Sequence, residues 1–196
     1  VEFRTISRED RMKLKASVMR DHIILVGLGH LGRRLANLLT KIGENFVVVV
    51  LPSDKEENEF LVELEERGVP VIFGDASSRR VLEEAGIKRA RAVIITVDDD
   101  LVNSMIADRA REANPRVRIV ARIFREEIAR VLELSGDVNV AISTTLASSP
   151  LFLAGTSHDL ELNVPAVVPV RAGPEVGGSS VRELEEKGEV RSVEPE

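Results

Sequence analysis

A glycine-rich turn between a short apolar run and a helical pattern is the feature that most restricts how this chain folds. Residues 22–26 (HIILV) are typical of a buried strand, and Gly27, Gly29 and Gly32 follow them at the spacing G-x-G-x-x-G. Leucines then recur at helical intervals as far as Leu39. A strand, a glycine turn and a helix in this order form the context in which the motif binds the pyrophosphate of a nucleotide. A tight strand-to-helix turn that binds nothing is the alternative.

Each glycine of this motif has a predicted task. Gly27 makes the tight turn, Gly29 lets the backbone approach a phosphate, and Gly32 lets the helix pack closely on the strand. The partly positive start of the helix then points at the phosphates. His30 is either a phosphate donor or an ordinary surface histidine. The candidate nucleotide site therefore includes the whole motif: Gly27, Leu28, Gly29, His30, Leu31 and Gly32.

Strand-like and helix-like segments alternate from the motif up to about residue 143. The strand-like segments are short runs of β-branched and aliphatic residues, which are typical of parallel strands buried on both faces. This alternation predicts an α/β fold, a Rossmann-like doubly wound parallel sheet. Between the second and third strands we expect one helix over residues 54–67. The strands themselves are expected at residues 22–26, 46–51, 69–73, 92–97, 117–121 and 138–142.

The turns after these strands are expected to share one edge of the sheet. Parallel strands joined by right-handed crossovers all end on the same side, and ligands bind outside those ends where the strand order reverses. Gly29 follows the first predicted strand, Leu51 ends the second, and Asp75 follows the third. Residues 98–100 (DDD) follow the fourth. We therefore expect these positions to gather around one cleft.

The end of the second strand weakens the case for a dinucleotide. Proteins that bind NAD carry an acidic residue there, about 20 residues past the glycines, which binds the ribose hydroxyls. This chain has Leu51 instead, and Asp54 comes three positions later, where it would cap the next helix. No arginine stands nearby to favour a 2′-phosphate. NAD or NADH, another adenine nucleotide (ADP, ATP or AMP) and an empty site all stay open as alternatives.

Composition argues against several other functions. The chain has 196 residues and a net charge of −6, which disfavours a nucleic-acid partner. It has no cysteine, so disulfides and thiolate zinc sites are not available. No apolar run approaches the length of a membrane span and no signal peptide is present, which fits a cytoplasmic location. Tyrosine is absent too, and His22 and His158 have no recognisable catalytic setting, so we expect no catalytic residue.

The two ends of the chain differ from its middle. Residues 1–20 mix charges of both signs and are expected to form a linker, an arm, a helix leading into the first strand or a disordered leader. Residues 144–163 are expected to be a connecting segment. Residues 164–196 carry several prolines and glycines and are too few to bury a core of their own. We expect them to be part of a second, smaller α+β lobe.

A series of motifs in order resembles the RCK family of regulators of potassium conductance, also called KTN or TrkA-N domains. The matching segments are DHIILVGLGHLGRRLA, GDAS at residues 74–77, EEAGIKRARAVIITVDDDLVN, VRIVAR at residues 117–122 and LELSGDVNVAIS. They cover residues 21–143, which we take as the N-terminal lobe. The later segment EVGGSSVREL is similar to the glycine turn of the family's C-terminal (TrkA-C) lobe.

The resemblance implies regulation of an ion conduit. Domains of this family form homodimers or higher rings on the cytoplasmic side of a potassium channel or transporter, whose pore is fused to them or separate. A bound nucleotide or cation changes the arrangement of the subunits and gates the pore, so it must bind one arrangement more tightly than the other. A nicotinamide oxidoreductase of the same fold and a passive oligomerisation module with a vestigial site are the alternatives.

The resemblance also extends the candidate site. It implies that Asp75 and Ala76 lie beside the adenosine, although Asp75 also suits a simple turn. Asp98, residues 99–100 and Asn103 match the family's acidic turn after the fourth strand, beside the phosphates or the nicotinamide half, although a solvated first helical turn is the alternative and suits Asp99. Arg122 matches a family arginine that faces the cleft, where it would meet a phosphate. Calcium-gated relatives carry an acidic pair where this chain has Arg122 and a phenylalanine, so a divalent cation has no recognisable site.

Overall fold

The computed structural model describes residues 7–55, 59–144 and 148–149, all within the first of the chain's two units, residues 1–153. They form a six-stranded sheet, parallel throughout, in the order β3-β2-β1-β4-β5-β6. The predicted Rossmann-like doubly wound sheet is therefore confirmed. The strands are β1 (Ile23–Val26), β2 (Phe46–Val50), β3 (Val71–Phe73), β4 (Ala92–Ile95), β5 (Arg118–Arg122) and β6 (Val140–Ile142). The helices are α1 (Arg8–Val18), α2 (His30–Lys41), α3 (Glu59–Glu66), α4 (Arg79–Glu84), α5 (Asp100–Ala113) and α6 (Glu126–Ser135), with short 3-10 helices at Pro52–Lys55 and Ile87–Arg89.

The central strands form because their sequences are unbroken runs of aliphatic and aromatic side chains, which suit a sheet covered on both faces. Every residue of β1 and β2 is buried. Strand β1 pairs with β2 on one side and with β4 on the other. The strand order reverses at β1 and β4, so the sheet edge beyond these two strands is where a ligand is expected.

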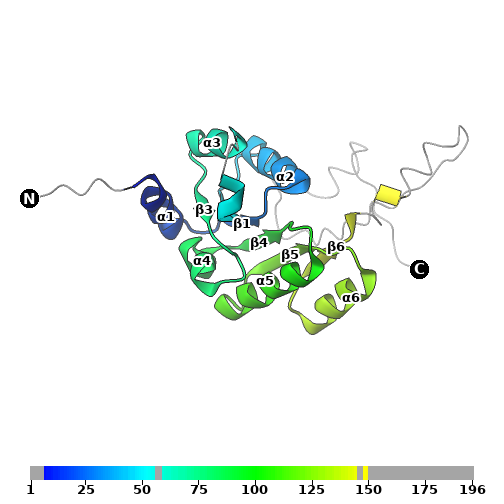
Figure 1. The fold of residues 1–196 in the computed structure, drawn as a ribbon. Helices are drawn as coiled ribbons and strands as arrows, with labels where there is room; N and C mark the ends of the chain where they lie inside the picture. Colours follow the sequence, from blue (N-terminus) through cyan, green and yellow to red (C-terminus); the bar gives the residue numbers. More distant parts are fainter. Residues whose placement is uncertain (1–6, 56–58, 145–147, 150–196) are drawn as a thin grey trace, which may run out of the picture. The chain divides into compact units, whose positions relative to one another are not determined.

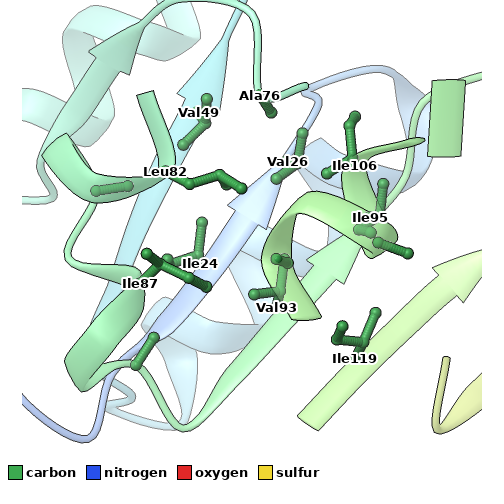
Figure 2. Close-up of a cluster of buried hydrophobic side chains, with 14 of the residues drawn as sticks. Ile24, Val26, Val49, Ala76, Leu82, Ile87, Val93, Ile95, Ile106 and Ile119 are labelled. Atoms are coloured by element: carbon green, nitrogen blue, oxygen red, sulfur yellow. The ribbon is translucent and has the colours of Figure 1, made fainter. Parts of the chain in front are cut away.

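Two hydrophobic clusters hold the layers together, one on each face of the sheet. Because side chains alternate along a strand, Ile24 and Val26 face the first cluster, whereas Ile23 and Leu25 face the second. Residues of α1, α4 and α5 complete the first cluster, and residues of α2 and α3 complete the second. Figure 1 shows α2 and α3 on one side of the sheet and α4, α5 and α6 on the other. Figure 2 shows how side chains of the first cluster surround Ile24.

The helix predicted over residues 54–67 is wrong in its extent. Pro52–Lys55 form a 3-10 turn, and α3 covers only Glu59–Glu66. Residues 56–58 lie outside the described residues. Proline suits the first position of a helical turn, because its φ is already fixed and its missing N–H is not needed there. The chain therefore starts to turn at Pro52, before the predicted start at Asp54.

Of the alternatives for residues 1–20, the structure shows a helix, α1, that packs against the rest of the fold. Ser7 caps α1 by accepting a hydrogen bond from the N–H of Asp10 (3.1 Å). On its inner face, Ala16 is fully buried in the first cluster. Lys13 pairs with Glu84 of α4 (3.0 Å), and Lys15 donates to the carbonyl of Gly68. These contacts fasten α1 beside α4 and the chain that enters β3.

His22, at the start of β1, is a buried polar residue in this junction. Its side chain is completely buried, and Nε2 lies 2.9 Å from the carbonyl oxygen of Ala85. Within the described residues, Nδ1 has no hydrogen-bond partner. Burial lowers the pKa of His22 and the nearby Arg89 guanidinium lowers it further, which together outweigh the hydrogen bond to Ala85 and the charge of Asp21. Folding therefore favours the neutral imidazole of His22, whose Nε2–H donates to the carbonyl of Ala85.

We expect the free energy of unfolding to fall as the pH drops below the ordinary pKa of histidine, about 6.5. Because the pKa of His22 is lower in the folded protein, the unfolded state binds this proton more readily just below about pH 6.5, so stability rises with pH across that window. Urea unfolding from about pH 7.5 down to pH 5 measures this slope, and His22→Gln should flatten it. An unaltered slope in His22→Gln would contradict the assignment.

Candidate functional site

The glycine motif lies at the carboxyl end of β1, next to the neighbouring strand ends. Gly27 has a φ of +88°, and its N–H donates to the carbonyl of Val49 in β2 (3.0 Å). A Cβ on Gly32 would lie 2.1 Å from the carbonyl oxygen of Gly27, far inside van der Waals contact. Only glycine at position 32 therefore lets the first turn of α2 pack this closely on the turn after β1.

Gly29 caps the start of α2 and faces open space. Among the described residues, a Cβ added there would have one heavy atom within 4 Å, Oδ2 of Asp98 at 3.9 Å. No side-chain hydrogen bond caps this end of α2 in the described residues, and the first turn carries no acidic residue. Its free N–H groups and the positive end of the helix dipole can therefore bind an anion, with room for that anion to reach the backbone.

Thr96, one residue past β4, ties this strand to the glycine turn. Its hydroxyl is buried and lies 2.9 Å from the carbonyl oxygen of Val26 and 3.1 Å from that of Gly27. The same oxygen would meet a Cβ at Gly32 at 3.0 Å. Sequence reasoning missed this residue, although a threonine that ends an otherwise aliphatic strand is a signal of a buried hydroxyl with a specific partner.

The three aspartates after β4 have three different roles. Asp98 is largely exposed, with 74% of its side chain accessible. Asp99 caps α5 by accepting a hydrogen bond from the N–H of Val102 (2.9 Å). Asp100 is buried and accepts from the N–H groups of Phe124 (2.7 Å) and Arg125 (3.0 Å). Burial alone would raise the pKa of Asp100, but these hydrogen bonds and the Arg125 guanidinium outweigh it and lower the pKa. Asp100 thus anchors the turn after β5 as a carboxylate.

Asn103 of α5 clamps the ends of two neighbouring strands. Its side chain is fully buried, and Nδ2 donates to the carbonyls of Val97 (2.7 Å) and Arg122 (2.8 Å). The resemblance placed Asn103 beside the phosphates or the nicotinamide half of a ligand. In the structure its side chain is buried and its amide holds the two strand ends at this edge of the sheet.

Arg122, the last residue of β5, reaches toward the glycine turn. Its Nη1 makes an ion pair with Oδ1 of Asp98, and its guanidinium stacks on the Phe124 ring with Cζ 4.2 Å from the ring centre. Its side chain is 19% exposed, and Nε is buried without a hydrogen-bond partner in the described part of the chain. The structure therefore brings together Gly29, Asp98 and Arg122, which are far apart in sequence.

The other predicted site residues are less directly placed for ligand contact. Leu51 follows β2 and is half-exposed, whereas Asp75 is exposed and accepts from the N–H of Ser77 (2.8 Å) in a local turn. Leu28 and Ala76 are buried in the second and first clusters, so only their backbone atoms are available (Figure 2 shows Ala76). Within the motif His30 is exposed and Leu31 is half-buried.

Two further features bear on function. The described residues contain no group of three or more histidine, cysteine or acidic side chains arranged to hold a metal ion. Within residues 7–55, 59–144 and 148–149, each helix is too short or too polar to cross a bilayer. His158 and the predicted lobe at residues 164–196 lie outside the described residues.

The glycine geometry predicts opposite results for two alanine substitutions. Gly32→Ala should lower the free energy of unfolding by about 3 kcal/mol, because its Cβ would overlap the carbonyl of Gly27. Gly29→Ala has room and an ordinary negative φ, so it should cost less than about 1 kcal/mol, the loss expected at a helix cap. Chemical unfolding of both variants measures the difference. Equal losses in the two would show that α2 does not depend on the close contact at Gly32.

The sequence of this chain is similar to those of potassium channel and potassium-efflux proteins. The chain is 31% identical over 140 residues to the probable potassium channel protein 2 of Methanocaldococcus jannaschii, a match that covers 69% of this chain and 39% of that protein. It is 31% identical over 116 residues to the glutathione-regulated potassium-efflux system protein KefC of an Enterobacter strain, covering 59% and 18%. The chain thus spans well under half the length of these relatives.

Solved structures show the same fold. The TrkA-N domain of the Escherichia coli inner membrane protein YbaL superposes with a TM-score of 0.63 at 24% identity, covering 71% of this chain and 99% of that one. The GsuK channel bound to NAD gives 0.54 at 25% identity, covering 65% and 22%. The Kef C-terminal domain of Shewanella denitrificans in its AMP-bound form gives 0.53 at 25% identity, covering 69% and 82%. The TrkA-N domain model matches residues 23–144, and this chain therefore belongs to the TrkA-N (RCK) domain family.

Proposed function

We propose that this chain is a cytoplasmic, ligand-sensing regulatory domain of a potassium channel or transporter. An adenine nucleotide binds at the glycine motif and favours one arrangement of the subunits, and that rearrangement gates ion flow. The observation that carries the proposal is the open face of Gly29 at the start of α2, where no side-chain hydrogen bond from the described residues caps the helix. A glycine that leaves space beside free N–H groups is what a phosphate needs in order to approach a backbone.

The similar proteins support both parts of this proposal. The relatives include a probable potassium channel protein and a potassium-efflux system protein. Two of the similar structures, each 25% identical to this chain, are a channel bound to NAD and a Kef C-terminal domain in AMP-bound form. We extend the ligand class and the membrane partner to this chain, in preference to an oxidoreductase or a passive oligomerisation module.

The proposed ligand contacts follow from the positions at the sheet edge. The N–H groups of Gly29 and His30 donate hydrogen bonds to a phosphate, and Arg122 supplies a positive charge from the other side of the β4 end. Asp75 and the backbone of Ala76, after β3, lie on the adenosine side. The remaining proposed contacts are Gly27, Leu28, Leu31, Gly32 and Leu51, and Asp98 lies at the border of the same site.

The proposal also covers how copies of the chain assemble and what residues 144–196 contribute. We propose that the domain works as a homodimer or a larger ring, because gating requires the nucleotide to change how copies sit against one another. The pore is either fused to the chain or a separate membrane subunit. Residues 21–143 form the nucleotide-binding lobe, and residues 164–196 form part of a TrkA-C-like lobe joined to it by residues 144–163.

Thermal unfolding with AMP, ADP, ATP, NAD and NADH tests nucleotide binding. A ligand at about 100 times its Kd should add about 2.7 kcal/mol, which raises the Tm by roughly 5–10 °C. Gly29→Asp should abolish the shift, because a carboxylate would fill the open face and repel phosphate. Asn37→Asp adds the same charge at an exposed position of α2 and should retain the shift. A folded wild-type protein with an unchanged Tm in all five nucleotides would overturn the proposal.

Leu51 predicts weak recognition of the ribose. With no carboxylate at the end of β2, the wild-type protein should bind AMP and 2′-deoxy-AMP with affinities within about threefold, since the charged hydrogen bonds to the hydroxyls are missing. Leu51→Asp should favour AMP over 2′-deoxy-AMP by about tenfold or more. Isothermal titration with both nucleotides measures these ratios, and Leu51→Asn is the uncharged control. Strong wild-type preference for AMP would show that another residue binds the ribose.

A further inference from the structure

A single carboxylate, that of Asp98, lies between the proposed phosphate site and Arg122. Oδ2 of Asp98 is the heavy atom nearest to the open face of Gly29, at 3.9 Å from the position of an added Cβ. The other oxygen, Oδ1, is paired with Nη1 of Arg122. Because β4 lies between β1 and β5, Asp98 spans the distance from the glycine turn to the end of β5. An anion that enters beside Gly29 therefore meets Asp98 before it meets Arg122.

The two partners of this ion pair are held very differently. Arg122 is 19% exposed, stacks on the Phe124 ring and has its carbonyl fixed by Asn103. The neighbouring turn is anchored by Asp100, through the N–H groups of Phe124 and Arg125. Asp98 is 74% exposed, and the structure shows it bonded to Arg122. When the pair separates, Arg122 stays in place and the Asp98 side chain turns into solvent.

Arg122 also has unused capacity for an anion. Its Nε is buried and donates to no acceptor within the described residues. A monodentate contact with one carboxylate oxygen leaves the guanidinium less well satisfied than the paired hydrogen bonds that a phosphate accepts from arginine. A phosphate with two negative charges is thus a stronger partner for Arg122 than the singly charged carboxylate of Asp98.

We infer that Asp98 is a built-in competitor of the ligand phosphate: it neutralises Arg122 in the empty site and must release it when a nucleotide binds. This inference rests on the proposed nucleotide site and concerns its selectivity. Asp98 lowers affinity for every anion. A terminal phosphate monoester such as that of AMP, with two negative charges on one phosphate, overcomes this competition better than the pyrophosphate of NAD, whose two phosphoryl groups carry one charge each. Asp98 therefore determines which class of nucleotide can occupy the site.

Isothermal titration of AMP at about 0.15 M ionic strength, where exposed charges are largely screened beyond 8 Å, tests the inference on a matched set of variants. Asp98→Asn removes the competing charge and should tighten AMP binding by about fivefold. Asp99→Asn removes an equal charge from the next residue while keeping an N-cap, because asparagine caps as well as aspartate, and should change affinity by less than about twofold. Arg122→Gln should weaken binding by about tenfold or more.

The double variant separates competition for Arg122 from simple repulsion. In the Arg122→Gln background, Asp98→Asn should tighten AMP binding by clearly less than in the wild-type protein, because no guanidinium is left to release. Asp98→Asn should raise the affinity for NAD by a larger factor than the affinity for AMP, because NAD competes less well with Asp98 for Arg122. If the wild-type protein binds AMP and Asp98→Asn leaves that affinity unchanged or weakens it, the inference is overturned but the proposed function stands. A wild-type protein that binds no nucleotide would remove the proposed function and the inference with it.

Discussion

The close contact between α2 and the turn after β1 is the constraint on which the candidate site depends. With a Cβ at position 32 only 2.1 Å from the carbonyl oxygen of Gly27, the helix and strand can meet in this way only through glycine. The contact directs the start of α2 to the carboxyl edge of the sheet, where Gly29 is left open. A packing requirement within the fold thus creates the surface at which we propose that a phosphate binds.

Around this turn, buried polar residues fix the neighbouring strand ends. Thr96 joins β4 to the glycine turn, Asn103 joins β4 to β5, and Asp100 anchors the turn after β5. Each is buried and makes its hydrogen bonds mainly with backbone groups, so each holds its strand end firmly. Against this fixed frame Asp98 is exposed and paired with Arg122, which makes it the part of the site that can change with the least disturbance.

Much of the fold was predictable from local sequence, and less of the site. Aliphatic runs such as Phe46–Val50 and the glycine motif specify strand, turn and helix through neighbouring residues, so the doubly wound sheet followed directly. The helix predicted over residues 54–67 was wrong at its start, because proline begins the 3-10 helix Pro52–Lys55 two residues earlier. Asn103 of α5 bonds to the carbonyl of Arg122, 19 residues later, and Asp98 in the turn after β4 pairs with Arg122, 24 residues later. No local pattern shows that these groups meet.

Occupation of the open face of Gly29 can be observed directly at the backbone amides of the motif. Titration of isotopically labelled protein with AMP, followed by NMR, reports on each amide of residues 27–32. Our account predicts saturable shifts that are largest at Gly29 and His30, with Ile42 at the far end of α2 unaffected. Saturable binding of AMP that leaves the motif amides unmoved and shifts signals elsewhere would contradict it.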